Sequence, residues 1–293
     1  MTNLLPNKEE LNLRFILIAV WIFLLPPVSA YAGEPKRYEI PRTQVVPIKD
    51  SQSNKQYELL IKLPESYANT KDKTFPVIYF TDAVWHIELL SSITSFMMQD
   101  VILVGISWQK DAEKHLIEEH GEHVSRFRDY SFRESSDPET QAKYKLGQAN
   151  KHLTFIQKDV FNYVESSYRT DPNNRSYFGF SFGGLFGAYA LMTQPETFKN
   201  YLLGSPSLWR LSELKSIANL ENRSLNVNLF VSNGAQEAEL KPHIDDFINF
   251  MTTQNDNTLK LEYFEVDSAG HSDSSPMMSA RSIKWLSALQ TKG

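Results

Sequence analysis

The sequence predicts an α/β fold with a mostly parallel central sheet covered by helices on both faces. Short runs rich in β-branched and aromatic residues alternate with longer segments of helical periodicity. This alternation is typical of consecutive βαβ units, which build parallel sheets. The chain contains no segment with the composition of an interdomain linker. We therefore expect a single domain over residues 33–293.

Composition narrows the class of protein. With 293 residues, the chain is long enough for one large α/β domain, and 41% apolar with 22% charged residues is ordinary for a globular protein. The formal net charge of -5 argues against a nucleic-acid interface, which needs clustered basic residues. The chain has no cysteine, so disulfides, thiolate catalysis and cysteine-bound zinc are excluded.

The first 32 residues predict a signal peptide. Lys8 and Arg14 precede an apolar run at 15–25, and Ala-Tyr-Ala at 30–32 is a small-x-small cleavage pattern. We expect cleavage before Gly33 and a periplasmic or secreted product that keeps no stable membrane anchor. The alternative is an uncleaved anchor, although the apolar run is short for a bilayer crossing.

The elements of the first half follow in order. Residues 33–56 are polar and contain three prolines, which indicates an extended lead-in. Strands are predicted at 57–64, 75–82 and 100–107, where β-branched and aromatic residues dominate. Residues 110–140 combine dense charge with weak periodicity. We predict a long irregular excursion there, and such excursions are typically functional.

The second half alternates regularly. Apolar residues recur every three or four positions over 146–164 and predict a helix, which Asp171 and Pro172 separate from the next strand. Three further strands, each followed by a helix, and one strand without a following helix complete the predicted sheet. The strands are predicted at 175–181, 200–206, 227–234 and 259–266, and the helices at 182–192, 237–251 and 276–290.

Residues Gly179 to Gly183 form a G-x-S-x-G pattern centred on Ser181, between a predicted strand and a predicted helix. In that context the serine occupies a strained turn that lifts its hydroxyl above the sheet edge, and the flanking glycines avoid collisions. Ser181 is thus the candidate nucleophile. The alternative is that these glycines, with Gly187, only let the helix pack closely on the sheet.

A serine hydroxyl needs a base, which in this arrangement follows the nucleophile along the chain. Two histidines do so. His271 lies in a Gly/Ser-rich loop after the last strand, from which it can reach back over the sheet edge, so it is the candidate base. His243 falls within a charged helix and is expected to be a solvated surface residue.

The acid that orients the base should follow the strand at 227–234. Glu237 comes soonest after that strand and is the first candidate, ahead of Glu239, Asp245 and Asp267. An exposed glutamate at a helix start is the alternative role of Glu237.

Two backbone amides should form the oxyanion hole. The amide of Phe182 follows the nucleophile, and a second should come from the loop after 75–80, from Ala83 or Val84.

Other patterns are weaker. Residues 115–123 carry three histidines but match no zinc-protease spacing, so a solvated charged segment is expected there, and no metal site. Phe182 and Trp85 are candidates to line a substrate pocket, while Phe180, Phe186 and Trp209 are expected in the core.

Several stretches, in order, resemble the esterase D-like α/β-hydrolases: FPVIYFTDA, RFRDYS, GFSFGGLFGAYAL, SPSLW and DSAGHSDSSP. Within that group the periplasmic siderophore esterases, which open enterobactin-type trilactones, are most similar. The resemblance covers most of residues 40–290. It implies the α/β-hydrolase fold and cofactor-free hydrolysis of carboxylic esters.

The resemblance also implies roles for residues. It places the nucleophile at Ser181, the base at His271 and the acid at Glu237 in a G-x-x-E turn, although some members use a serine–histidine pair alone. Arg126, in the RxxDY stretch, is implied as a group that holds an acidic or catecholate substrate, with an exposed or ion-paired arginine as the alternative. The chain departs from the family at Ala83, where members usually have glycine.

Together these observations predict an exported serine esterase that acts on a small-molecule ester, including siderophore trilactones. A secreted binding protein on the same fold and an acyltransferase using the same serine are the alternatives. The ester substrate and the oligomeric state stay open.

Overall fold

The computed structural model describes residues 37–220, 225–254 and 257–290. The described residues from Ile40 onward form one compact unit. The predicted signal peptide at 1–32 lies outside the described residues. Across the described ranges, the structure contains no helix with both the length and the apolar character needed to cross a membrane.

An eight-stranded sheet forms the centre of the unit, with strand order β1-β2-β4-β3-β5-β6-β7-β8. Strands β3 to β8 run parallel, whereas β2 is antiparallel to β1 and β4. The predicted mostly parallel sheet is confirmed. The strands are β1 (Thr43–Lys49), β2 (Gln56–Lys62), β3 (Phe75–Phe80), β4 (Ile102–Ile106), β5 (Thr170–Phe180), β6 (Asn200–Gly204), β7 (Asn228–Gly234) and β8 (Lys260–Val266).

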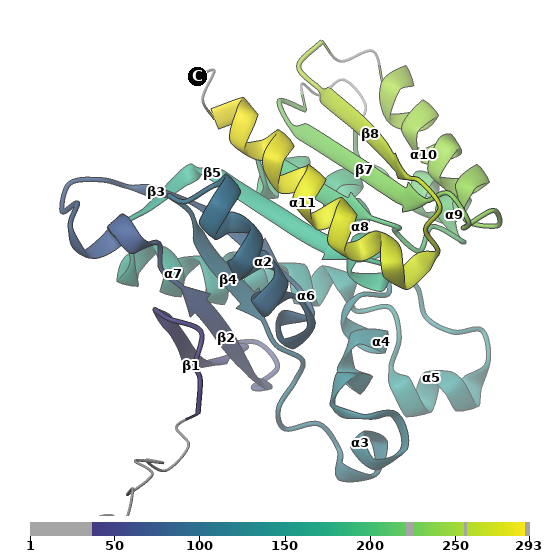
Figure 1. The fold of residues 1–293 in the computed structure, drawn as a ribbon. Helices are drawn as coiled ribbons and strands as arrows, with labels where there is room; N and C mark the ends of the chain where they lie inside the picture. The colour runs from purple at the N-terminus through teal and green to yellow at the C-terminus, as the bar shows by residue number, and fades with distance from the viewer. Residues whose placement is uncertain (1–36, 221–224, 255–256, 291–293) are drawn as a thin grey trace, which may run out of the picture. The chain divides into compact units, whose positions relative to one another are not determined.

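Helices cover both faces of this sheet (Figure 1). On one face α2 (Ala83–Met97) packs against α11 (His271–Gln290). On the other face α8 (Phe182–Thr193) lies against β5 and β6, α7 (Phe161–Ser167) against β5, and α10 (Lys241–Thr253) against β7. Two buried apolar clusters, one on each face, hold the three layers together.

Four details differ from the sequence prediction. The lead-in contains strand β1, which pairs only with β2; an edge strand tolerates its Pro47 because the missing N–H faces away from the ladder. Helix α2 was not predicted. The helix predicted at 237–251 begins at Lys241, which leaves Glu237 in a turn. The last helix begins at His271, five residues before Pro276, so His271 lies in its first turn and not in a loop.

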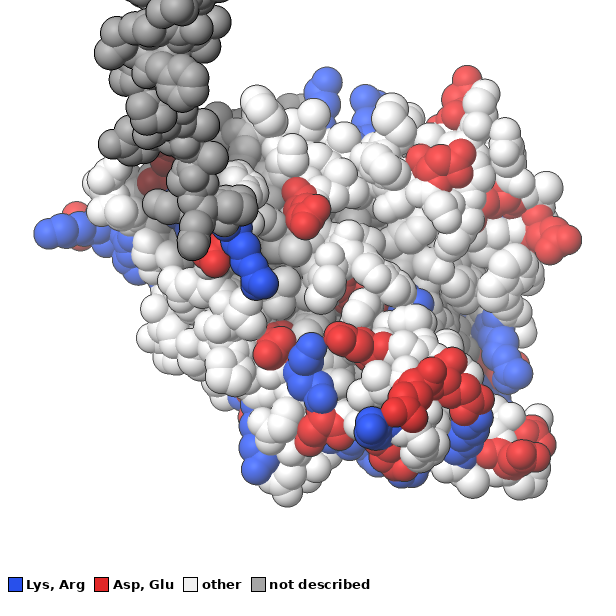
Figure 2. Space-filling model, turned by 60° about the horizontal axis from the view of Figure 1, so that its bottom comes forward, with Lys and Arg blue, Asp and Glu red and all other residues white. Residues whose placement is uncertain are grey.

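The excursion after β4 contains short helices and is therefore less irregular than predicted. They are α3 (Lys114–His120), α4 (Ser125–Asp129) and α5 (Pro138–Tyr144), and they precede α6 (Ala149–Phe155), which continues through a π-helical turn (Ile156–Val160) into α7. Figure 2 shows basic and acidic side chains interspersed on the face that these helices share. Pairs such as Lys143–Glu119 and Lys145–Glu113 explain how the dense charge is accommodated.

Candidate active site

Ser181 occupies a sharp turn between β5 and α8. Its φ of 57° is a conformation that side chains other than glycine rarely adopt. A Cβ at Gly179 would lie 2.4 Å from the Gly183 carbonyl oxygen, and one at Gly183 would lie 2.6 Å from Thr81 Oγ1. Both positions therefore require glycine, and the strained turn presents the Ser181 hydroxyl at the carboxyl edge of the sheet.

The three residues predicted to act together lie within hydrogen-bonding distance. His271 Nε2 is 2.9 Å from Ser181 Oγ, and His271 Nδ1 is 2.6 Å from Glu237 Oε1. They come from the ends of β5, β7 and β8, which are brought to one edge because these strands run parallel. The arrangement is that of a serine, a base and an orienting carboxylate.

Glu237 is anchored on its other oxygen as well. Glu237 Oε2 accepts hydrogen bonds from Ser205 Oγ at 2.6 Å and from the Gly234 amide at 2.7 Å. Burial raises the pKa of the Glu237 carboxyl, but the hydrogen bonds from His271, Ser205 and Gly234 outweigh burial and hold that pKa below its ordinary value. The carboxylate thus stabilises the fold above the unfolded-state pKa, and this stabilisation is lost as pH falls through the lower, folded-state pKa.

The other candidates have different surroundings. His243 lies on α10 with its ring 5.4 Å from the ring of Trp209. Asp245 forms an ion pair with Lys241 at 2.6 Å on the same helix. Of the two candidate bases, only His271 is hydrogen-bonded to Ser181 in the described part of the chain.

The amides expected at the oxyanion hole occupy equivalent places on neighbouring strands. Ala83 is the first residue of α2 and Phe182 the first of α8, where a backbone N–H has no partner within its own helix. The preceding strands pair in parallel, so both helices start at the same edge. Ala83 fits because Gly105 faces its methyl group: a Cβ at Gly105 would lie 2.8 Å from the Ala83 Cβ.

Arg126 forms a two-point ion pair with Asp82, the residue before Ala83. Its Nε lies 3.1 Å from Asp82 Oδ1 and its Nη2 lies 3.0 Å from Oδ2, with only 1% of the Asp82 side chain exposed. Trp108 Nε1 and the Tyr130 hydroxyl also donate to Asp82 Oδ1. Sequence reasoning missed Asp82, although an acidic residue at the end of a predicted buried strand was a signal for it.

This contact predicts a large stability effect. Arg126→Ala leaves the Asp82 carboxylate buried and short of its cation, so we expect the free energy of unfolding to fall by about 3–5 kcal/mol. Urea denaturation measures the change. Lys114→Ala is the control, because the Lys114–Glu118 pair is largely exposed and should contribute little. An Arg126→Ala protein as stable as the Lys114→Ala protein would contradict the prediction.

Two cavities adjoin the turn that carries Ser181: Ser181 lines one, and the next residue, Phe182, lines the other. One, of about 600 Å³, is lined by Ser181, His271 and residues 236–240; the other, of about 510 Å³, is lined by α4, α8 and the end of the charged excursion. Ser207 and Trp209 line both. Trp209 was expected in the core but is 54% exposed, because it follows β6 at the site edge. Phe182, a candidate pocket residue, lines the 510 Å³ cavity.

Trp85 lies elsewhere. Its indole is 49% exposed and packs against Arg126, whose guanidinium is 4.9 Å from the ring centroid, and it lines neither cavity.

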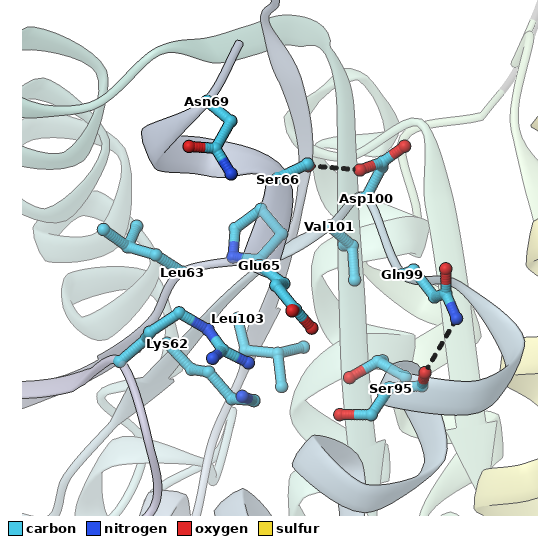
Figure 3. Close-up of a pocket in the computed structure, with 13 residues that line it drawn as sticks. Lys62, Leu63, Glu65, Ser66, Asn69, Ser95, Gln99, Asp100, Val101 and Leu103 are labelled. Atoms are coloured by element: carbon cyan, nitrogen blue, oxygen red, sulfur yellow. Dashed lines mark hydrogen bonds between the residues drawn. The ribbon is translucent and has the colours of Figure 1, made fainter.

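A third cavity, of about 300 Å³, lies at the opposite edge of the sheet, where Asp100 and Val101 lead into β4 (Figure 3). There Ser66 donates a hydrogen bond to Asp100, and Gln99 to the Ser95 carbonyl.

The three histidines of 115–123 have separate partners. His115 lies beside Glu113, His120 beside Glu119 and the Tyr144 hydroxyl, and His123 against Trp85 and Trp108. Within the described ranges, no three His, Asp or Glu side chains are grouped so that they could hold a metal ion.

A strained serine follows a parallel strand, and a histidine and a carboxylate from later in the chain lie beside it. This arrangement defines the α/β-hydrolases that use a serine nucleophile. Comparison with known proteins agrees with this class. Residues 51–276 match the model of the Esterase family, so the chain belongs to that family and is a carboxylic ester hydrolase.

Three relatives illustrate the similarity. The ferri-bacillibactin esterase BesA of Bacillus subtilis is 23% identical over 275 residues, which cover 86% of this chain and 92% of BesA. Among solved structures, the BES protein from Bacillus cereus superimposes with a TM-score of 0.73 at 20% identity, covering 86% of this chain and 97% of its own. An IroE-like serine hydrolase from Shewanella oneidensis superimposes with a TM-score of 0.70 at 22% identity, covering 83% of this chain and 79% of its own.

Proposed function

We propose that this esterase hydrolyses its substrate through an acyl-enzyme formed on Ser181. The observation that carries the proposal is the chain of two hydrogen bonds that links Ser181 Oγ to the His271 imidazole and the imidazole to Glu237. A serine hydroxyl becomes nucleophilic only when a base removes its proton as it attacks, and an imidazole at 2.9 Å can do so.

The steps follow from the positions of the groups. Ser181 Oγ attacks the ester carbonyl while His271 Nε2 takes its proton. The amides of Phe182 and Ala83 donate to the oxyanion, and the Glu237 carboxylate holds the imidazole tautomer and stabilises the imidazolium. His271 then protonates the leaving alcohol, the C–O bond breaks, and water attacks the acyl-enzyme with the same base.

We further propose that siderophore esters of the trilactone type are substrates. The support is the similarity over most of the chain to a ferri-bacillibactin esterase. The test is a hydrolysis screen across iron-free and iron-loaded trilactones, aryl esters and acetylated sugars, scored by kcat/KM. Trilactones should rank first; an acetylated sugar in that place would overturn this assignment while leaving the esterase mechanism intact.

Catalysis, as opposed to binding alone, has a direct test. A fluorophosphonate probe labels a serine that an adjacent base activates, and a binding protein that kept only the fold would not react. We expect stoichiometric labelling, with the modified peptide containing Ser181. Labelling that survives Ser181→Ala would place the nucleophile elsewhere.

We propose that the mature enzyme begins at Gly33 and acts in the periplasm or outside the cell. The support is the sequence of residues 1–32, where a basic start, an apolar run and a small-x-small tripeptide follow in order. Intact-mass measurement of the exported protein tests it, and a mature chain that begins at Met1 would reject it.

A further inference from the structure

The two cavities beside Ser181 differ in their walls, and we propose that they receive different halves of the ester. The alcohol cavity is lined by Ser181, His271 and residues 236–240. The acyl cavity also has polar residues in its lining, but most of the surface that it exposes is apolar, with contributions from Phe127, Phe132, Leu146, Phe182 and Leu185. The acyl cavity, we infer, binds a bulky, uncharged aromatic acyl group. This inference rests on the proposed acyl-enzyme mechanism.

The position of the base sets the direction in which the substrate lies. His271 Nε2 must pass its proton to the leaving oxygen, so the alcohol portion has to lie on the histidine side of Ser181. His271 lines only one of the two cavities, which is therefore the alcohol cavity. The acyl substituent extends to the opposite side of the carbonyl, past Phe182, whose amide is the proposed oxyanion donor and whose ring lines the acyl cavity.

The walls of the acyl cavity favour an aromatic group. Its volume of about 510 Å³ falls within the range of small-molecule sites. Three phenylalanine rings and the partly exposed Trp209 present flat apolar surfaces, against which an aromatic ring packs in stacked or edge-on contacts. Leu146, between α5 and α6, also lines this cavity and is only partly buried.

The charges of the acyl cavity are already balanced. Three arginines line it, but Arg126 pairs with Asp82 at 3.0 Å. Arg133 and Arg210 both contact Glu213, at 2.9 Å and 3.6 Å. Glu134 adds a further carboxylate to the lining. An acyl group with its own negative charge would compete with these carboxylates, so an uncharged group should bind better.

The wild-type enzyme provides the first test. Its kcat/KM should be compared for the p-nitrophenyl esters of acetic, 2-naphthoic and 4-carboxybenzoic acids, which share one leaving group. We expect the naphthoate to exceed the 4-carboxybenzoate by at least about tenfold. A preference for the carboxybenzoate, or no discrimination between the two, would overturn the inference. This comparison needs no substitution and so does not depend on the folding of a variant.

A cavity-filling variant provides the second test. Leu146→Trp should lower the ratio of naphthoate to acetate kcat/KM by about tenfold or more, because the indole occupies the acyl cavity. Ala238→Trp, in the alcohol cavity, is the matched control and should change that ratio by less than about twofold. A ratio unmoved by Leu146→Trp would reject the acyl cavity alone, since wild-type acetate hydrolysis would still support the proposed function. Failure of the wild-type protein to hydrolyse any ester would reject both.

Discussion

Ser181→Ala should reduce kcat for a p-nitrophenyl ester by roughly 10⁴- to 10⁶-fold, which is the largest effect that we expect of any single substitution. The substitution removes the only atom of the residue that can form a bond to the ester carbonyl. It leaves the oxyanion amides and both cavities in place, so a small residual rate above that of water should persist.

The fold should tolerate this change. Alanine has the same backbone restrictions as serine, so the strain of the turn at φ 57° is kept and not increased. Thermal unfolding of the variant should therefore be close to that of the wild type. Ser212→Ala, at an exposed position on α9 (Leu211–Ser216), is the matched control and should keep full activity. Hydrolysis retained by Ser181→Ala would reject the assignment of the nucleophile.

Much of the fold could be predicted because most of the inner strands are buried on both faces. Runs such as those of β3 and β4 are almost wholly apolar and stand out from the polar segments around them. Strand β1 could not be recognised in the same way, because an edge strand is largely exposed and its sequence is correspondingly mixed. The last helix was predicted to begin at Pro276, because proline is common in the first turn of a helix. Here Pro276 lies inside the helix, which begins at His271.

The site was predictable to the extent that local sequence determines it. Gly179 and Gly183 mark the turn at Ser181, because no larger residue fits there. The chain order of serine, acid and histidine then limited the candidates for the remaining positions. An ion-paired Arg126 was among the alternatives, but its partner Asp82 could not be identified, because the pair joins residues 44 positions apart through the packing of the excursion against the end of β3. The exposure of Trp209 likewise depends on how the loop after β6 lies beside the site.

Glu237→Gln should lower kcat by roughly 10⁴-fold, because the amide forces the wrong tautomer on His271. One oxygen of Glu237 accepts from the Gly234 N–H, a backbone donor that cannot reverse its role. In the variant, the glutamine carbonyl oxygen must take this place, which turns the NH₂ group toward His271 Nδ1. The imidazole then has to accept at Nδ1 and carry its proton on Nε2, where it faces Ser181 Oγ and cannot act as a base.

Glu237→Ala separates a full triad from a serine–histidine pair, because alanine removes the carboxylate without imposing a tautomer on His271. If the pair works alone, Glu237→Ala should cost less than about tenfold in kcat, since a base that needs no partner loses only a modest stabilisation. Asp245→Asn is the matched control: it also converts a carboxylate to an amide, but on the exposed side of α10, and it should leave kcat unchanged. Steady-state kinetics on one p-nitrophenyl ester measures all three variants. Because glutamine keeps the size of the side chain, a large loss in Glu237→Gln would report the proton position on His271 and not a collapse of the site.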